Sequence, residues 1–164
     1  PMITSSSSRN RAMRVKFMIP GEPKGKGRPR VERHGDRTVT RTPDDTIIYE
    51  NLVRTEYMRQ CKGHRFPDDS QLDLRVIAYY PIPSSKSKKQ QRLMEDGTIR
   101  PTKKPDTDNV LKVIADSLNQ VAYKDDAQVV DASVRKFYSR KPRTVVFLSE
   151  YIHLDPPGGG GAGE

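Results

Sequence analysis

Two groups of acidic residues in the second half of the chain have the types and spacing of a metal-dependent hydrolytic site. They are Asp106-Thr107-Asp108-Asn109 and the later pair Asp125-Asp126. Mg²⁺ is a hard cation that prefers carboxylate oxygens and often completes its coordination shell with substrate phosphate. Such a cation neutralises phosphodiester charge, lowers the pKa of a bound water and stabilises the leaving oxygen. We therefore interpret these acids as a divalent metal site that cleaves nucleic acid, with Asp106, Asp108, Asp125 and Asp126 as candidate ligands.

A helix that starts just after Pro105 must position the first acid group. Its apolar residues recur at the spacing of one buried helix face: Val110, Leu111, Ile114 and Leu118. Asp108, Lys112 and Asp116 recur at intervals of four residues and form a separate polar row. Lys112 lies one turn beyond Asp108, where its ammonium could hold a phosphate oxygen, stabilise transition-state charge or orient a water.

The same residues also have a purely structural interpretation. Asp106 or Asp108 could cap the helix, because an aspartate at a helix start often accepts hydrogen bonds from the first backbone N–H groups. Asp125-Asp126 could belong to an ordinary turn, and Lys112 could be an i+4 ion-pair partner of Asp108. The residues by themselves leave both interpretations open.

The charge balance favours the metal site. The chain has 164 residues, a formal net charge of +9, 33% hydrophobic residues and 31% charged residues. This length suits one domain, and a basic balance of this size is typical of proteins that meet a polyanion such as nucleic acid. Excess lysine and arginine could also serve solubility alone. Acids without a metal, however, would repel the phosphates that the rest of the chain attracts.

Three basic segments are candidate contacts to the DNA backbone. Their residues are Lys24, Lys26, Arg28 and Arg30 in the glycine-rich stretch 21–30, Lys86, Lys88 and Lys89 in 84–91, and Lys103 and Lys104 before the first acid group. Glycines let a backbone approach a ligand closely, so 21–30 is predicted to be a flexible phosphate clamp. It lacks the spacing and the terminal Lys-Ser/Thr of a P-loop. A merely solvated loop is the alternative for 21–30 and for 84–91.

Other residue types exclude several chemistries. Cys61 is the single cysteine, so neither an internal disulfide nor a cysteine-based zinc site is available, in keeping with a reducing, intracellular setting. The three histidines (His34, His64 and His153) give little support to a histidine-based nuclease. No apolar run approaches the ~20 residues of a membrane span.

The remaining pattern predicts one small α/β domain over 13–154. The expected elements are a strand at 13–19, two short strands around the turn at 34–36, a helix at about 43–61, a strand at 71–81, a helical second half of 84–91, and strands at 127–138 and 143–152. The last two strands could form an antiparallel hairpin. The helix at 43–61 is expected to bury Ile47, Ile48, Leu52, Val53 and Tyr57. Residues 1–12 are predicted to be a disordered leader or a remnant of recombinant expression, and 155–164 a flexible Gly-rich tail.

Taken together, the motifs resemble one known family. The acidic part comprises Asp106-Thr107-Asp108-Asn109, Lys112, Asp116-Ser117-Leu118 and Asp125-Asp126-Ala127-Gln128-Val129. This combination resembles the signature of RusA-type Holliday junction resolvases. The earlier Ile19-Pro20-Gly21 and Lys24-Gly25-Lys26-Gly27-Arg28-Pro29-Arg30 are similar to the N-terminal part of phage and Gram-positive members. The resemblance covers residues 13–152.

The resemblance implies a homodimeric, Mg²⁺-dependent endonuclease, with Mn²⁺ as an alternative ion, that nicks four-way DNA junctions symmetrically in recombination and repair. It implies metal ligands at Asp106, Asp108 and Asp126, with Asp125 as a further candidate, and a catalytic lysine at Lys112. The implied fold is a single small α/β (α+β) domain with a mixed sheet flanked by helices. A C2 dimer suits the task, since a four-way junction has approximate two-fold symmetry and its two nicks must be paired.

The implied location is the cytoplasm of a bacterial or phage-infected cell. Two other functions use the same residues. One is a non-catalytic basic protein that binds junctions or duplex DNA, and the other is a nuclease for other branched or flap DNA. The lysine-rich insertion at 84–91 and the long N-terminal arm-like loop depart from the family pattern, so no cleavage-sequence preference is carried over.

Overall fold

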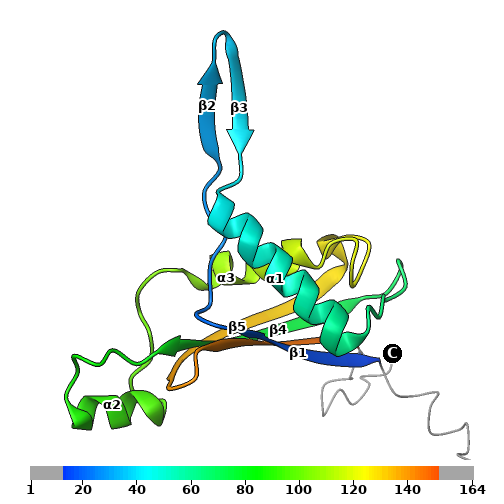
Figure 1. Cartoon of the computed structure of the whole chain (residues 1–164). Helices are drawn as coiled ribbons and strands as arrows, with labels where there is room; N and C mark the ends of the chain where they lie inside the picture. Colours follow the sequence, from blue (N-terminus) through cyan, green and yellow to red (C-terminus); the bar gives the residue numbers. More distant parts are fainter. Residues whose placement is uncertain (1–12, 152–164) are drawn as a thin grey trace, which may run out of the picture.

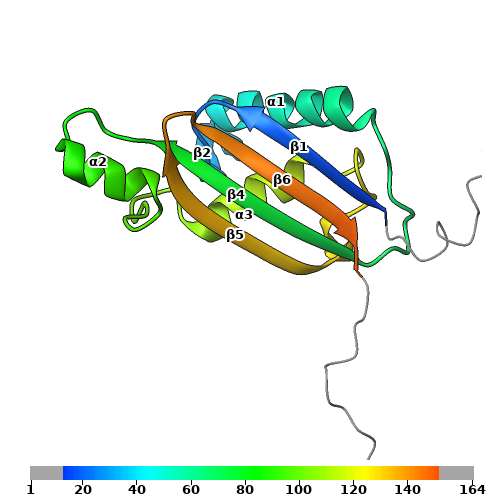
Figure 2. The same cartoon turned by 90° about the horizontal axis from the view of Figure 1, so that it is seen from below.

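A mixed four-stranded sheet with helices on one face forms the body of the protein (Figures 1 and 2). The computed structural model describes residues 13–151. The sheet has the order β1-β6-β4-β5, with β1 at Arg14–Pro20, β4 at Leu72–Pro81, β5 at Val129–Ser139 and β6 at Arg143–Glu150. Helices α1 (Asp44–Cys61) and α3 (Thr107–Ser117) cover one face. The predicted single small α+β domain with a mixed sheet is confirmed, while the predicted tails at 1–12 and 155–164 lie outside the described residues.

The connection between β4 and β5 places α3 on the sheet. These two strands are parallel, and a parallel pair needs a long crossover, which here contains α2 (Lys88–Glu95) and α3. β6 pairs antiparallel with both β1 and β4. The predicted antiparallel hairpin between 127–138 and 143–152 is therefore wrong, because β4 lies between the two strands.

Helix α1 buries part of the predicted stripe, since Val53 and Tyr57 lie in the core and Leu52 packs against it. Its buried residues are Thr46, Tyr49, Val53 and Tyr57. Ile47 and Ile48 are 40% and 67% exposed, so their predicted burial is wrong. Tyr49 owes its place to a partner that hydropathy does not reveal, since its hydroxyl shares a 2.9 Å hydrogen bond with Thr144 of β6. A polar group with such a partner is buried at little cost.

Helix α3 is anchored largely as predicted. Val110, Ile114 and Leu118 are at most 1% exposed, whereas Leu111 is only partly buried and Val113 takes its place in the core. Burying side chains of this size contributes about 1.5–3 kcal/mol each. This side of α3 is therefore fixed on the sheet, and its polar row is held in a defined orientation.

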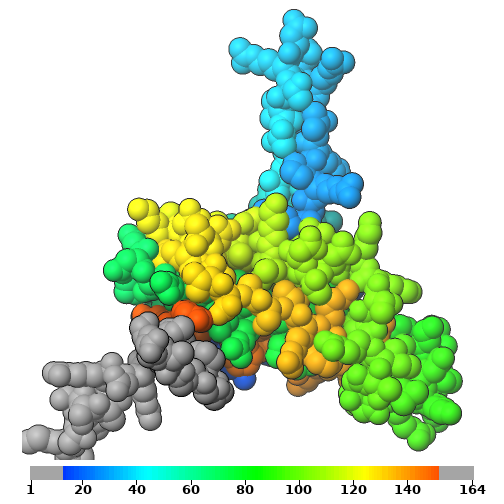
Figure 3. Space-filling view, turned by 180° about the vertical axis from the view of Figure 1, so that it is seen from behind, coloured from blue at the N-terminus to red at the C-terminus, as the bar shows by residue number. Residues whose placement is uncertain are grey.

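A separate two-stranded sheet stands away from the body. It consists of β2 (Arg30–His34) and β3 (Arg37–Arg41), which pair antiparallel around the predicted turn, where Gly35 has φ +63°. Glycine adopts this left-handed conformation without strain. The hairpin projects beyond the N-terminal end of α1 (Figure 1), and the view from behind also shows it standing out from the body (Figure 3). Among residues 13–151, no helix has both the length and the apolar character that a membrane span requires.

Candidate active site

The first acid group lies at the exposed start of α3. Asp106 is the N-cap residue of α3, but its side chain makes no capping hydrogen bond, and the capping interpretation therefore does not account for it. Asp106, Asp108 and Lys112 are all exposed. None of the ion pairs formed within 13–151 joins Asp108 to Lys112. Within 13–151, therefore, Asp106 does not cap α3 with its side chain and Asp108 is not paired with Lys112. All three side chains face solvent.

The second acid group lies at the other end of α3. Asp126 begins a short 3-10 helix (Asp126–Gln128), and its backbone N–H donates to the Asn119 side-chain oxygen at 2.8 Å. This anchor brings the Asp126 carboxyl against Asp125 and against Asp116 from the last turn of α3. The pKa of Asp126 is raised, first by the carboxyl–carboxyl hydrogen bond with Asp125, then by burial and by the Asp116 charge. Carboxylates crowded in this way disfavour full ionisation.

Asp125 has a structural role that Asp126 lacks. The Asp125 side chain accepts a hydrogen bond from the Ala127 N–H at 3.2 Å, and Gln128 completes a capping box by accepting from the Asp125 N–H. The bond from Ala127 is the main reason why the pKa of Asp125 is lowered. The turn interpretation is therefore confirmed for Asp125, while the Asp126 carboxyl interacts with those of Asp125 and Asp116.

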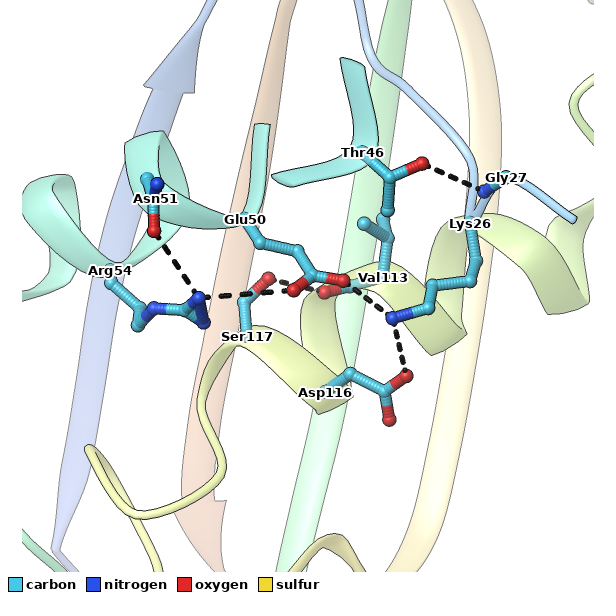
Figure 4. A network of polar contacts seen from close by, with 9 residues as sticks. All are labelled: Lys26, Gly27, Thr46, Glu50, Asn51, Arg54, Val113, Asp116 and Ser117. Atoms are coloured by element: carbon cyan, nitrogen blue, oxygen red, sulfur yellow. Dashed lines mark hydrogen bonds and ion pairs between the residues drawn. The ribbon is translucent and has the colours of Figure 1, made fainter. Parts of the chain in front are cut away.

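Lys26 is held inside the protein by two carboxylates. Its ammonium lies 2.5 Å from Glu50 of α1 and 3.2 Å from Asp116 of α3, as Figure 4 shows. Partial burial alone would lower the pKa of Lys26, but the hydrogen bonds to Glu50 and Asp116 outweigh it and leave the pKa raised. The ion triad therefore joins α1, α3 and the chain after β1.

The segment that carries Lys26 is anchored and is not the flexible clamp that the sequence predicts. The Lys26 N–H donates to the Asn109 carbonyl at 3.0 Å, and the Gly27 N–H donates to the Thr46 hydroxyl at 3.1 Å. A Cβ atom added at Gly25 would lie 2.6 Å from Pro105 Cβ. The glycines let this backbone approach the two helices closely, rather than a ligand.

The other predicted DNA contacts are on the surface. Exposed cations include Lys24, Arg28 and Arg30 in the first segment, Lys86, Lys88 and Lys89 around the start of α2, and Lys103 and Lys104 before α3. Their exposure permits contact with phosphates, and Lys26 is the exception.

The two acid groups lie at opposite ends of α3. Asp108 and Asp116 are eight residues apart on one helix, about 12 Å along its axis, so one ion does not bridge the two ends of α3. Accordingly, no three acidic, histidine or cysteine side chains within 13–151 come together as metal ligands. Asp116 is the acid of α3 whose charge raises the pKa of Asp126. The crowded carboxylates of Asp116 and Asp126 offer the hard oxygen donors that Mg²⁺ prefers.

Sequence reasoning missed two features of this site. Glu50 has the i, i+4 spacing of a solvated ion pair with Arg54, yet its side chain is only 13% exposed and it also holds Lys26. Asp116 stood in the polar row with Asp108 and Lys112, and that spacing was the available signal for a site residue. Which carboxylate Asp126 approaches depends on the chain reversal after α3, and no local spacing encodes it.

A strongly basic α+β domain that gathers acids along one crossover helix has the features of a nucleic-acid-processing protein. Comparison with known families makes this class specific. Residues 20–149 match the family described as endodeoxyribonuclease RusA, and the chain belongs to that family. The chain is also 37% identical over 136 residues to the uncharacterized protein YqaN of Bacillus subtilis (strain 168), a match that covers 83% of this chain and 96% of the relative. The family resemblance of the motifs is thereby confirmed.

Proposed function

We propose that the protein is a Mg²⁺-dependent, structure-selective endonuclease that resolves four-way DNA junctions by paired, symmetric phosphodiester cleavage in recombination and repair. The cytoplasm of a bacterial or phage-infected cell is its proposed location. The observation that carries the proposal is the contact between Asp116 and Asp126 in a member of an endodeoxyribonuclease family. Carboxylates held together in a chain of net charge +9 favour a divalent cation between them.

Each residue has a stated role in this proposal. Asp116 and Asp126 would hold the cation at the C-terminal end of α3, and Asp106 and Asp108 are the ligands that the family resemblance implies at the N-terminal end. A bound cation supplies charge neutralisation and a water of lowered pKa. Lys112 lies between the two acid groups on the polar row, where its ammonium would bind a non-bridging phosphate oxygen and stabilise the charge that develops there.

The proposed assembly is a homodimer. A four-way junction has approximate two-fold symmetry, and ligatable products require two nicks at related positions. Two copies related by a two-fold axis supply two equivalent sites. Sedimentation of the protein with and without junction DNA measures this directly, and a 1:1 complex of one protein chain with one junction would contradict it.

Strand cleavage of a synthetic four-way junction tests the activity. Each of the four strands is labelled in turn and incubated with the protein in Mg²⁺, in Mn²⁺ and in EDTA. We expect nicks at symmetric positions in two opposing strands with Mg²⁺, and none with EDTA. Duplex, flap and three-way substrates of the same sequence are the controls. Binding without metal-dependent nicking would make the protein a non-catalytic junction binder, and preferential cutting of a flap would make it a different branched-DNA nuclease.

A further inference from the structure

The β2–β3 hairpin lacks a core of its own and is left without support from the body. Every residue of the two strands is exposed except Glu32, which is half-buried. Val31 is 68% exposed and Val39 is 48% exposed. An isolated two-stranded hairpin is marginally stable in water, because it buries little apolar surface. An arm of this kind is explained more readily by a binding partner than by a role in holding the fold together.

Positive charge on the hairpin indicates what that partner is. The arm and its base carry five arginines and two acids: Arg28, Arg30, Arg33, Arg37 and Arg41 against Glu32 and Asp36. Paired residues of an antiparallel ladder share one face, so Arg30 lies opposite Arg41. Arg41 has Asp44 at 3.4 Å, whereas none of the ion pairs within 13–151 includes Arg30, Arg33 or Arg37. Like charges directly opposite each other destabilise a hairpin, and anions beside the unpaired arginines would relieve this. Phosphates of nucleic acid supply such anions on both sides of a groove.

We propose that the β2–β3 hairpin is a DNA-binding arm that enters the major groove of one duplex arm of the substrate. The proposal rests on the proposed function for its partner, and assigns contact with that partner to the hairpin, outside the two acid groups. A two-stranded ribbon fits the major groove, which is about 12 Å wide. Five residues per strand give the hairpin a reach of about 17 Å. Arg33 and Arg37, near its tip, approach the base edges, while Arg30 and Arg41, at its base, contact phosphates.

A second copy of the chain is the competing occupant. Both edges of the hairpin carry arginines, and two such arms repel each other, as charged edges do in strands that avoid pairing. The same repulsion disfavours insertion into another basic surface of this protein. Charge complementarity therefore selects DNA over a second copy.

The decisive experiment compares two triple variants of equal charge. The arm variant is Arg33→Gln, Arg37→Gln and Arg41→Gln, and the control is Arg14→Gln, Lys62→Gln and Arg65→Gln, all exposed and outside the hairpin and the acid groups. Junction and duplex binding are measured by fluorescence anisotropy in EDTA from 50 to 300 mM salt. The arm variant is expected to bind about 10–100-fold more weakly at 0.1 M salt, with a salt slope smaller by about 2–3. Thermal unfolding establishes that both variants fold.

Protection of guanine N7 from methylation locates the arm on the DNA. Wild type and control are expected to protect guanines in a duplex arm of the junction, and the arm variant to lose this protection. Equal weakening by both variants, wild-type binding by the arm variant, or protection unchanged by the arm substitutions each overturns the proposal. Conversion of a wild-type dimer to a monomer by the arm variant would show that the hairpin contacts a second copy instead. A wild-type protein that neither binds nor cuts junctions would defeat the proposed function itself, which is a separate result.

Discussion

The acids at the two ends of α3 are held in different ways. Asp106 and Asp108 stand at the start of the helix, exposed and without a capping hydrogen bond from Asp106. Asp116 and Asp126 are half-buried at the other end, where Lys26 binds Asp116 and Asn119 binds the Asp126 backbone. Contacts within the fold therefore fix the positions of Asp116 and Asp126, whereas Asp106 and Asp108 remain accessible to a ligand from solvent.

The two acid groups also differ in how much they destabilise the folded state. Crowding Asp116 and Asp126 raises the pKa of Asp126, which means that the folded protein pays for keeping both carboxylates charged. The exposed pair has no comparable cost. Substitutions at the two ends should therefore agree in their effect on catalysis and disagree in their effect on stability, and the following tests exploit that contrast.

The largest expected effect is on cleavage. Asp108→Asn and Asp126→Asn should each lower the single-turnover rate of junction nicking by about 10³-fold or more, equivalent to about 4 kcal/mol of barrier, because each removes a carboxylate expected to serve metal-assisted chemistry. Junction binding should be preserved or tightened, since one negative charge near the phosphates is lost. Asp131→Asn, an exposed acid on β5, is the matched control and should cut normally. Normal cutting by Asp108→Asn would remove the exposed end of α3 from the catalytic site.

Lys112→Ala should have the second largest effect on cleavage. Loss of one cationic group that stabilises developing charge typically costs about 10²–10³-fold in rate. Nicking should fall by that amount, while the Kd for the junction changes by no more than about threefold. Lys141→Ala, an exposed lysine in the turn between β5 and β6, is the control. A large loss of affinity with little loss of rate at saturation would recast Lys112 as a residue that positions the DNA backbone.

Lys26→Ala should act on stability. The substitution leaves Asp116 without its cation and Glu50 with only Arg54 at 3.8 Å, and the Glu50 and Asp116 side chains are only 13% and 25% exposed. Removing one member of such a partly buried ion network should lower the free energy of unfolding by about 2 kcal/mol, less than the 3–5 kcal/mol of fully buried pairs. Urea denaturation measures this. Lys24→Ala, two residues away and exposed, should change stability little. Equal effects of the two substitutions would show that the triad contributes nothing measurable.

Periodicity and turn chemistry sufficed for most of the elements. The alternation from Leu72 to Ala78 predicted β4, and the stripe of α3 was right at Val110, Ile114 and Leu118. Strand order was not predictable in this way, because nothing local in β5 and β6 states that β4 lies between them. The same limit applies to Ile47 and Ile48, because the buried face of α1 includes Tyr49, whose hydroxyl has its partner on β6.

The site residues were likewise predictable where local spacing defines them, and not where contacts between distant elements do. Residue type and helical spacing selected Asp108, Lys112 and Asp116 as one polar row, and the structure keeps them on one helix. The approach of Asp126 to Asp116 and the inward turn of Lys26 depend on contacts between elements distant in sequence. A motif can therefore identify the acids of this site, but the tertiary fold decides which of them share a partner.

The smallest expected effect is on the free energy of unfolding, and it distinguishes the crowded Asp126 from the exposed acids. Because the pKa of Asp126 is raised above its ordinary value of 3.8, the folded state binds a proton more tightly than the unfolded state does. Stability from this group is therefore fully present at low pH and is lost as pH rises through the raised folded-state pKa. At pH 7 in EDTA, Asp126→Asn should unfold with about 1 kcal/mol more free energy than wild type, the scale of two unit charges ~4 Å apart in water.

This gain should shrink as the pH falls through the raised folded-state pKa, and it should vanish below the ordinary carboxyl pKa, where wild-type Asp126 is protonated in both states. Added Mg²⁺ should reduce the stability advantage of Asp126→Asn over wild type, since a ligand that binds only the folded state stabilises it by mass action. Wild type should therefore gain stability with added Mg²⁺, and Asp126→Asn should gain much less, while the exposed Asp131→Asn follows wild type throughout. An Asp126→Asn protein that is less stable than wild type in EDTA would mean that the carboxylate is satisfied as it stands, and the case for a cation between Asp116 and Asp126 would lose its physical basis.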